Sequence, residues 1–143
     1  MRIEIFLIFI LIFIVSCKTE KVDGIIIGET LLVHQSYTEN KELKIIIEKC
    51  LNKEEDGFKR LNSFNCGGGS GCYELGFVLT QIIYRIGEKN YLIAIKNLDK
   101  LTQTQLSSLI RAGLEYGDND YDNIQDNKKL NVEFPRIYNL TEN

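Results

Sequence analysis

The stretch NCGGGSGCYELG, residues 65–76, contains the residues of this chain whose types and spacing most readily suggest chemistry. Cys66 and Cys72 enclose five residues, of which four are glycine. Two thiols at short range can act as a redox couple or can close into a disulfide. Consecutive glycines before a helix can also let backbone N–H groups approach a phosphate. The loop therefore has three interpretations: a thiol-redox centre, a phosphate-binding loop or a disulfide-closed turn.

The residues that follow the glycines argue against phosphate binding. Phe77 and Val78 stand where a phosphate-binding loop needs Lys and Ser or Thr, and Glu74 would repel an anion. The redox interpretation is weakened by the spacing, which is C-x5-C rather than C-x-x-C. A helix that begins at Cys72 would nevertheless lower the pKa of that thiol. We therefore keep a thiol-redox enzyme that uses Cys66 and Cys72 as an alternative function.

A second group of candidate residues lies in the acidic segment DNDYDNIQDNKK, residues 118–129. Its carboxylates fall at positions 1, 3, 5 and 9 of a calcium-binding loop: Asp118, Asp120, Asp122 and Asp126. The segment partly resembles an EF-hand loop, but Lys129 occupies position 12, where the bidentate glutamate belongs. The sequence predicts no more than a weak calcium site here, and the alternative is a solvated acidic loop.

His34 is the only histidine in the chain and lies between Val33 and Gln35. A lone histidine leaves a hydrolytic triad little to build on, and it does not fall at paired ligand spacing with the cysteines. We interpret His34 as a structural or solvated residue. The sequence identifies no catalytic residue and requires no cofactor.

The N-terminal segment is the most specific motif in the chain. Arg2 precedes an unbroken apolar run, residues 5–15, which is too short to span a bilayer. The run ends in Ile14-Val15-Ser16-Cys17. The order of residue types is an aliphatic residue, a variable residue, a small residue and then cysteine. This segment resembles the signal peptide and lipobox of bacterial lipoproteins. The resemblance covers about the first twenty residues only.

The lipoprotein resemblance implies cleavage before Cys17 and attachment of lipid to its sulfur. Residues 1–16 would then be a cleaved signal peptide, residues 17–24 a polar tether and residues 25–143 a single domain. Two or three acyl chains hold a protein stably on a membrane. The resemblance thus implies a domain that is anchored to the membrane outside the cytoplasm. Lys18 stands where an aspartate commonly implies inner-membrane retention, so the outer membrane is favoured if the cell has one.

The extracytoplasmic location also bears on the remaining cysteines, because disulfides persist there. With Cys17 modified by lipid, three cysteines remain, and Cys50 lies on the apolar stripe of a predicted helix. We expect Cys50 to be a free thiol in the core. The flexible residues between Cys66 and Cys72 allow these two to form a disulfide. The alternative pairs Cys50 with one of them.

Hydrophobic periodicity predicts a helical domain. Ser36 and Glu39 have capping-box spacing before a helix over residues 36–55. Its apolar residues recur at helical spacing: Leu43, Ile46, Ile47, Cys50 and Leu51. Further helices are expected over residues 56–64, over the strongly apolar residues 72–87, and over residues 88–98. The last expected helix covers residues 101–117, with Thr102 and Gln105 as a second capping box and Gly117 as its end.

Two segments are harder to assign. Residues 25–37 begin with a β-branched run, but we interpret them as helix. Residues 130–140 are expected to form a short extended tail. The fold class is therefore all-α, either a compact bundle or a short stack of helical hairpins with five or six helices and an extended C-terminal tail.

Composition limits the function. The formal net charge is −3 and no block of basic residues is present, so nucleic acid is not an expected partner. We expect a non-enzymatic domain, anchored to the membrane through Cys17, that binds an envelope protein or serves as an accessory subunit. A narrower version is an immunity-type protein that neutralises a toxin by occluding it.

Overall fold

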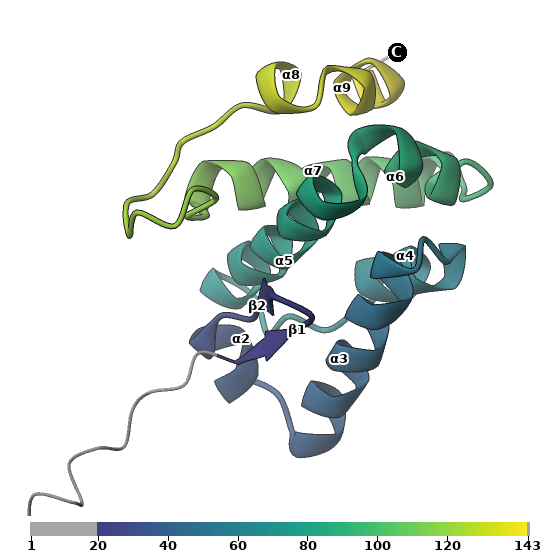
Figure 1. Cartoon of the computed structure of the whole chain (residues 1–143). Helices are drawn as coiled ribbons and strands as arrows, with labels where there is room; N and C mark the ends of the chain where they lie inside the picture. The colour runs from purple at the N-terminus through teal and green to yellow at the C-terminus, as the bar shows by residue number, and fades with distance from the viewer. Residues whose placement is uncertain (1–19, 143) are drawn as a thin grey trace, which may run out of the picture.

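A computed structural model describes residues 20–142 of the chain, so the predicted signal peptide and Cys17 lie outside the described residues. The described part contains eight helices, six of them of seven residues or more, and one two-stranded hairpin. The predicted all-α fold is confirmed (Figure 1). Its core is one continuous cluster of aliphatic and aromatic side chains contributed by the hairpin and by helices from α2 to α9. Within residues 20–142, no helix combines the length and apolarity needed to cross a membrane.

The chain enters the fold through a hairpin of β1 (Lys21–Val22) and β2 (Ile25–Ile26), followed by α2 (Glu29–Val33). The prediction of helix from residue 25 is therefore wrong for the first residues of that segment. The amide side chain of Gln81 explains this, because it bonds both the N–H of Ile26 at 2.8 Å and its carbonyl at 2.9 Å. The hairpin also contains residues 21–24 of the predicted tether, and Val22 is buried.

Helices α3 (Tyr37–Leu51) and α4 (Glu55–Asn62) form the first helical hairpin. The predicted capping box is confirmed: Glu39 N–H donates to Ser36 Oγ at 3.3 Å, and Ser36 N–H donates to Glu39 Oε2 at 2.7 Å. The predicted stripe faces the core, with four side chains fully buried: Leu43, Ile46, Ile47 and Cys50.

The centre of the molecule is the crossing of α5 (Ser70–Ile86) and α7 (Lys100–Tyr116). The two backbones meet at Gly76 and Gly113, where a Cβ on Gly113 would lie 2.2 Å from the Gly76 carbonyl oxygen. The helix lies within one residue of its predicted range, 101–117, but the predicted capping box at Thr102 and Gln105 is wrong. Asp99 is the N-cap and accepts from Thr102 N–H at 2.9 Å, so Thr102 lies inside the helix.

Helix α6 (Glu88–Ile95) follows α5 directly and leads to α7, whose other side carries α8 (Leu130–Glu133) and α9 (Pro135–Glu142). The predicted extended C-terminal tail is therefore wrong (Figure 1). Pro135 suits the first position of a helix, because its missing N–H needs no partner there. Glu88 accepts the N–H groups of Arg136 at 2.7 Å and Ile137 at 2.9 Å, so a distant carboxylate caps α9.

Candidate functional site

The glycine loop between α4 and α5 is a tight turn closed by a disulfide. Gly67, Gly68 and Gly69 have φ values of +73°, +84° and +50°, in the left-handed region that favours glycine. The loop brings Cys66 and Cys72 together, with their Cα atoms 4.9 Å apart, in the disulfide that the sequence predicted. The glycines therefore serve the conformation of the turn rather than the approach of a phosphate.

Glu74 has a structural role that the sequence did not reveal. Its carboxylate accepts the N–H of Thr30 at 3.3 Å and that of Leu31 at 2.5 Å, at the beginning of α2. The fit is close, because a Cβ on Gly28 would lie 2.1 Å from the Glu74 Cδ atom. Glu74 thus joins the N-terminal segment to α5 and satisfies two N–H groups that a helix start leaves unpaired.

The disulfide lines a groove of about 330 Å³ between α4, α5 and α7. Most of its lining is apolar and includes Phe64, Cys66, Cys72, Tyr73, Leu75 and Leu109. A second hollow, of about 370 Å³, lies on the other side of Tyr73 and is lined by Phe77, Tyr116 and Asp118 among others. Tyr73 therefore belongs to both hollows.

Tyr73 and Tyr116 stack on each other between the two hollows. Their ring centroids lie 4.4 Å apart at an interplanar angle of 23°, and the two residues are 43% and 45% exposed. The neighbouring Glu115 carboxylate raises the pKa of the Tyr116 hydroxyl. Tyr73 lies one turn before Gly76 and Tyr116 lies one turn after Gly113, so the close helix crossing places the rings in contact.

The acidic loop follows α7 directly and begins two residues after Tyr116. Carboxylate oxygens of Asp118, Asp120 and Asp122 lie within 4.8 Å of one another. The loop supports this arrangement, because Asp118 accepts the N–H of Asp122 at 2.9 Å and that of Asn123 at 3.0 Å. Burial raises the pKa of Asp120, and repulsion from Asp122 and Asp126 raises it further. The three carboxylates therefore concentrate negative charge in this loop.

Asp126, the fourth predicted calcium ligand, does not join the other three. Its side chain is only 3% exposed and forms an ion pair with Lys128 at 3.2 Å. It also accepts the N–H of Asn119 at 2.5 Å. Burial opposes its ionisation, but these hydrogen bonds and the Lys128 charge hold its pKa below the ordinary value. The structure thus brings together three of the four carboxylates and uses Asp126 to fix the loop.

These features form one surface, which we call the aromatic–acidic face and define as Tyr73, Tyr116, Asp118, Asp120 and Asp122, with the disulfide groove beside Tyr73. It joins the glycine loop and the acidic loop, which the sequence had marked separately. Tyrosine in a hydrogen-bonded or half-buried position presents a broad apolar body with a polar tip, which suits protein contacts.

Cys50 and His34 occupy the positions that the sequence predicted for them. Cys50 is a fully buried free thiol, and burial together with the nearby Glu54 and Asp56 carboxylates raises its pKa far above the ordinary value. His34 is exposed at the end of α2, next to the glycine loop, where a Cβ on Gly67 would lie 3.1 Å from the His34 Cβ.

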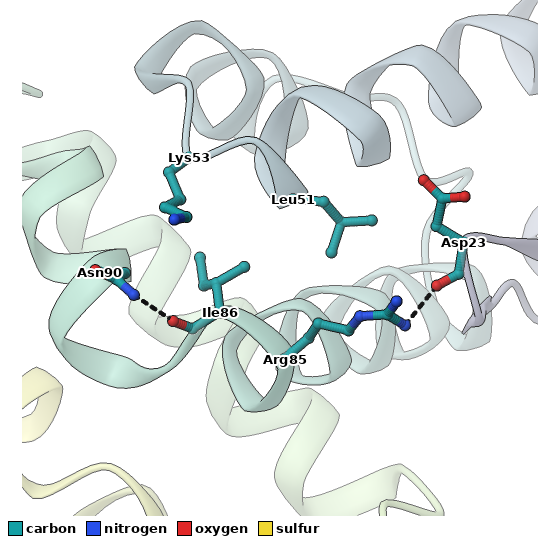
Figure 2. A pocket seen from close by; sticks show the side chains of 6 residues that line it. All are labelled: Asp23, Leu51, Lys53, Arg85, Ile86 and Asn90. Atoms are coloured by element: carbon teal, nitrogen blue, oxygen red, sulfur yellow. Dashed lines mark hydrogen bonds between the residues drawn. The ribbon is translucent and has the colours of Figure 1, made fainter.

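A hollow of about 460 Å³ lies at the opposite end of α5, next to the hairpin. Figure 2 shows Lys53 and Arg85 toward opposite ends of this hollow, with Leu51 and Ile86 between them. Arg85 donates to the Asp23 carbonyl at 2.5 Å, so part of its guanidinium is already engaged. The two cations do not converge on one point, and the hollow is therefore a weaker candidate than the aromatic–acidic face.

The contact between Tyr73 and Tyr116 could not be predicted from one sequence, because it depends on how α5 and α7 cross. The aromatic–acidic face is therefore identified from the positions of its residues in the folded structure. Comparison of the chain with protein-family models, with curated proteins and with solved structures finds no match.

Proposed function

We propose that this protein is a lipoprotein, anchored to a membrane through lipid on Cys17, whose helical domain binds an envelope protein. The anchor is supported by the Ile14-Val15-Ser16-Cys17 motif after an apolar segment. The domain lies outside the cytoplasm in this proposal, on the outer membrane if the cell has one. Its function is non-enzymatic.

The observation that carries the binding proposal is the exposed Tyr73–Tyr116 stack between two hollows. Tyrosine is enriched among the residues that contribute most to binding energy in protein interfaces. The adjacent carboxylates of Asp118, Asp120 and Asp122 favour a partner with Lys or Arg side chains, which tyrosine faces also attract. We therefore propose a basic protein surface as the partner. A toxin occluded by an immunity-type protein is a narrower case of the same interaction.

The thiol-redox alternative is supported by one observation, the position of the Cys66–Cys72 disulfide beside an open groove. A double variant, Cys66→Ser with Cys72→Ser, separates the two functions. The chain-entropy model gives the short loop closed by this disulfide about 2 kcal/mol of stability. A binding domain would lose that stability and retain its partner, whereas a thiol enzyme would lose its activity while remaining folded.

The anchor is tested by intact-mass measurement of protein purified from membranes. The expected product begins at Cys17 and carries the mass of a diacylglycerol group with an acylated amino terminus. Cys17→Ser should yield protein that lacks the lipid mass and retains residues 1–16. Wild-type protein that retains residues 1–16, or that lacks lipid, would contradict the anchor.

The binding face is tested by affinity capture from detergent-solubilised membranes. Tyr73→Ala with Tyr116→Ala should abolish capture of the partner, and exchange of the three clustered aspartates for asparagine should weaken it in a salt-dependent way. Ile93→Ala is the matched control, because Ile93 is 54% exposed on α6, away from the face. Equal capture by the tyrosine variant and the wild type would refute the assignment of this face.

A further inference from the structure

The described chain begins beside the junction of α2 and α3. Glu20 forms an ion pair with Lys44 at 2.6 Å, and its carbonyl accepts the Ile27 N–H at 2.9 Å. In the turn between β1 and β2, Asp23 lines a hollow together with Leu51, at the C-terminal end of α3. The hairpin therefore runs along α3 toward its C-terminus. Glu20 lies nearer the start of α3, because it lines one hollow together with Tyr37.

That end carries the two most exposed large apolar side chains of the described residues. Val33 at the end of α2 is 73% exposed, and Tyr37 at the start of α3 is 85% exposed. Tyr37 also lines a hollow of about 340 Å³ together with Glu20, Lys41 and Lys44. We call Val33, Tyr37, Lys41 and Lys44 the anchor face.

The charges on the anchor face favour an anionic surface. Lys41 is exposed and makes no ion pair within residues 20–142. Two acidic groups nearby are engaged, because Glu20 is paired with Lys44 and Glu39 accepts the Ser36 N–H in the capping box. Glu29, one turn before Val33 on α2, is exposed. An aromatic ring and an aliphatic side chain flanked by lysines are typical of protein segments that lie in the headgroup region of a bilayer.

The covalent chain sets how far this face can lie from the membrane. This step depends on the proposed lipid anchor at Cys17, which is three residues before Glu20. A residue spans at most about 3.3–3.6 Å, so Cys17 lies within roughly 11 Å of Glu20. Apolar side chains of interfacial helices enter the boundary between headgroups and acyl chains by roughly 5–10 Å. The anchor therefore holds this end of α3 within reach of the bilayer.

We propose that the anchor face lies against the membrane that carries the lipid, with Tyr37 and Val33 in the headgroup region and Lys41 against anionic headgroups. The lipid on Cys17 and the anchor face then bind the same bilayer at two points. Two points of contact restrict the orientation of the domain, which a lipid chain alone does not.

The absence of tryptophan from the sequence allows a direct test with a single fluorophore. Tyr37→Trp places it on the anchor face. Leu101→Trp is the matched control, because Leu101 is 67% exposed at the start of α7, far from the point where the described chain begins (Figure 1). Lipidated full-length mature protein carrying either variant is reconstituted into vesicles of phosphatidylethanolamine and phosphatidylglycerol with brominated acyl chains. Circular dichroism verifies the fold of each variant, and Val33→Trp replaces Tyr37→Trp if that variant fails to fold.

The expected result for Tyr37→Trp is a shift of tryptophan emission to shorter wavelength, with bromine quenching several-fold stronger than in Leu101→Trp. Adding Lys41→Glu to Tyr37→Trp should reduce this quenching on the anionic vesicles. Equal quenching in both variants, or none in either while the protein floats with the vesicles, overturns the proposal and leaves the lipid anchor intact. A shift to shorter wavelength without quenching indicates a protein contact and also overturns it. If mass measurement shows no lipid on the protein and the protein does not float with the vesicles, the anchor and this inference are refuted together.

Discussion

The crossing of α5 and α7 gives the sharpest stability prediction, because two glycines allow the backbones to touch. In Gly113→Ala, the new Cβ would lie 2.2 Å from the Gly76 carbonyl oxygen and 2.7 Å from the Phe77 nitrogen. Both are backbone atoms and cannot rotate away. Restoring an ordinary contact of at least 3.4 Å requires the two helices to separate at their closest point.

The size of the effect follows from two opposing terms. Overpacking a core by one methyl group costs about 1–3 kcal/mol, and contact with immobile backbone places this site at the upper end. Alanine inside a helix is favoured over glycine by about 1 kcal/mol. We therefore expect Gly113→Ala to lower the free energy of unfolding by about 2 kcal/mol. We also expect it to disturb the Tyr73–Tyr116 stack, which lies one turn away from the crossing on each helix.

Urea denaturation followed by far-ultraviolet circular dichroism measures the first effect, and the near-ultraviolet tyrosine signal reports the second. Ser108→Ala is the control on the same helix, because Ser108 is exposed and its change should stay within about 0.5 kcal/mol of wild type. Gly113→Ala with wild-type or higher stability would refute the close crossing, since alanine would then contribute only its helix propensity.

Three further predictions concern Tyr91, Asp126 and calcium binding by the acidic loop. Tyr91→Phe should raise the free energy of unfolding by up to about 1 kcal/mol in urea denaturation, because the fully buried Tyr91 hydroxyl has no hydrogen-bond partner in the described residues. Asp126→Asn should cost about 1 kcal/mol at pH 7, measured by urea denaturation. The folded-state pKa of Asp126 is lowered, so its contribution is present above the unfolded pKa near 4 and is lost as pH falls through the folded value. The variant should therefore lose less stability than wild type on acidification, and parallel pH curves would contradict this role. Millimolar calcium should leave the melting temperature unchanged, because Lys128 and Asn119 already engage Asp126; a rise in melting temperature would show that the acidic loop binds the ion.

The parts of the fold that follow local rules could be predicted from the sequence. The capping box at Ser36 and Glu39 and the buried stripe of α3 are set by residues within one or two turns of each other. The same holds for Gly87 and Gly117 at the ends of α5 and α7. The Cys66–Cys72 pair was predictable because so short and glycine-rich a segment turns back on itself easily and can bring the two thiols together.

Apart from the local Asp99 cap of α7, the errors occurred where distant side chains decide the local structure. Glu88 caps α9 and makes the C-terminal segment helical, whereas Gln81 holds Ile26 extended where helix was expected. Glu74 was interpreted only as a residue that repels phosphate, yet it caps α2. Each of these contacts joins residues more than forty positions apart, so no local pattern contains it.

The candidate site was only half visible in the sequence for the same reason. A run of glycines between two cysteines and a cluster of aspartates marked two loops, because consecutive glycines and repeated aspartates are unfavourable inside a helix. Nothing indicated that the loops share a surface, since Tyr73 and Tyr116 meet only through the crossing of α5 and α7.

We propose that the lipid-anchored domain binds a protein through its aromatic–acidic face. The most direct measurement places a photoreactive amino acid at Tyr73 in living cells, with the same residue at Ile93 as the control position. We predict one discrete protein adduct from position 73, with a basic partner surface, and none of that size from position 93. No adduct from position 73, or the same adducts from both positions, would contradict the claim.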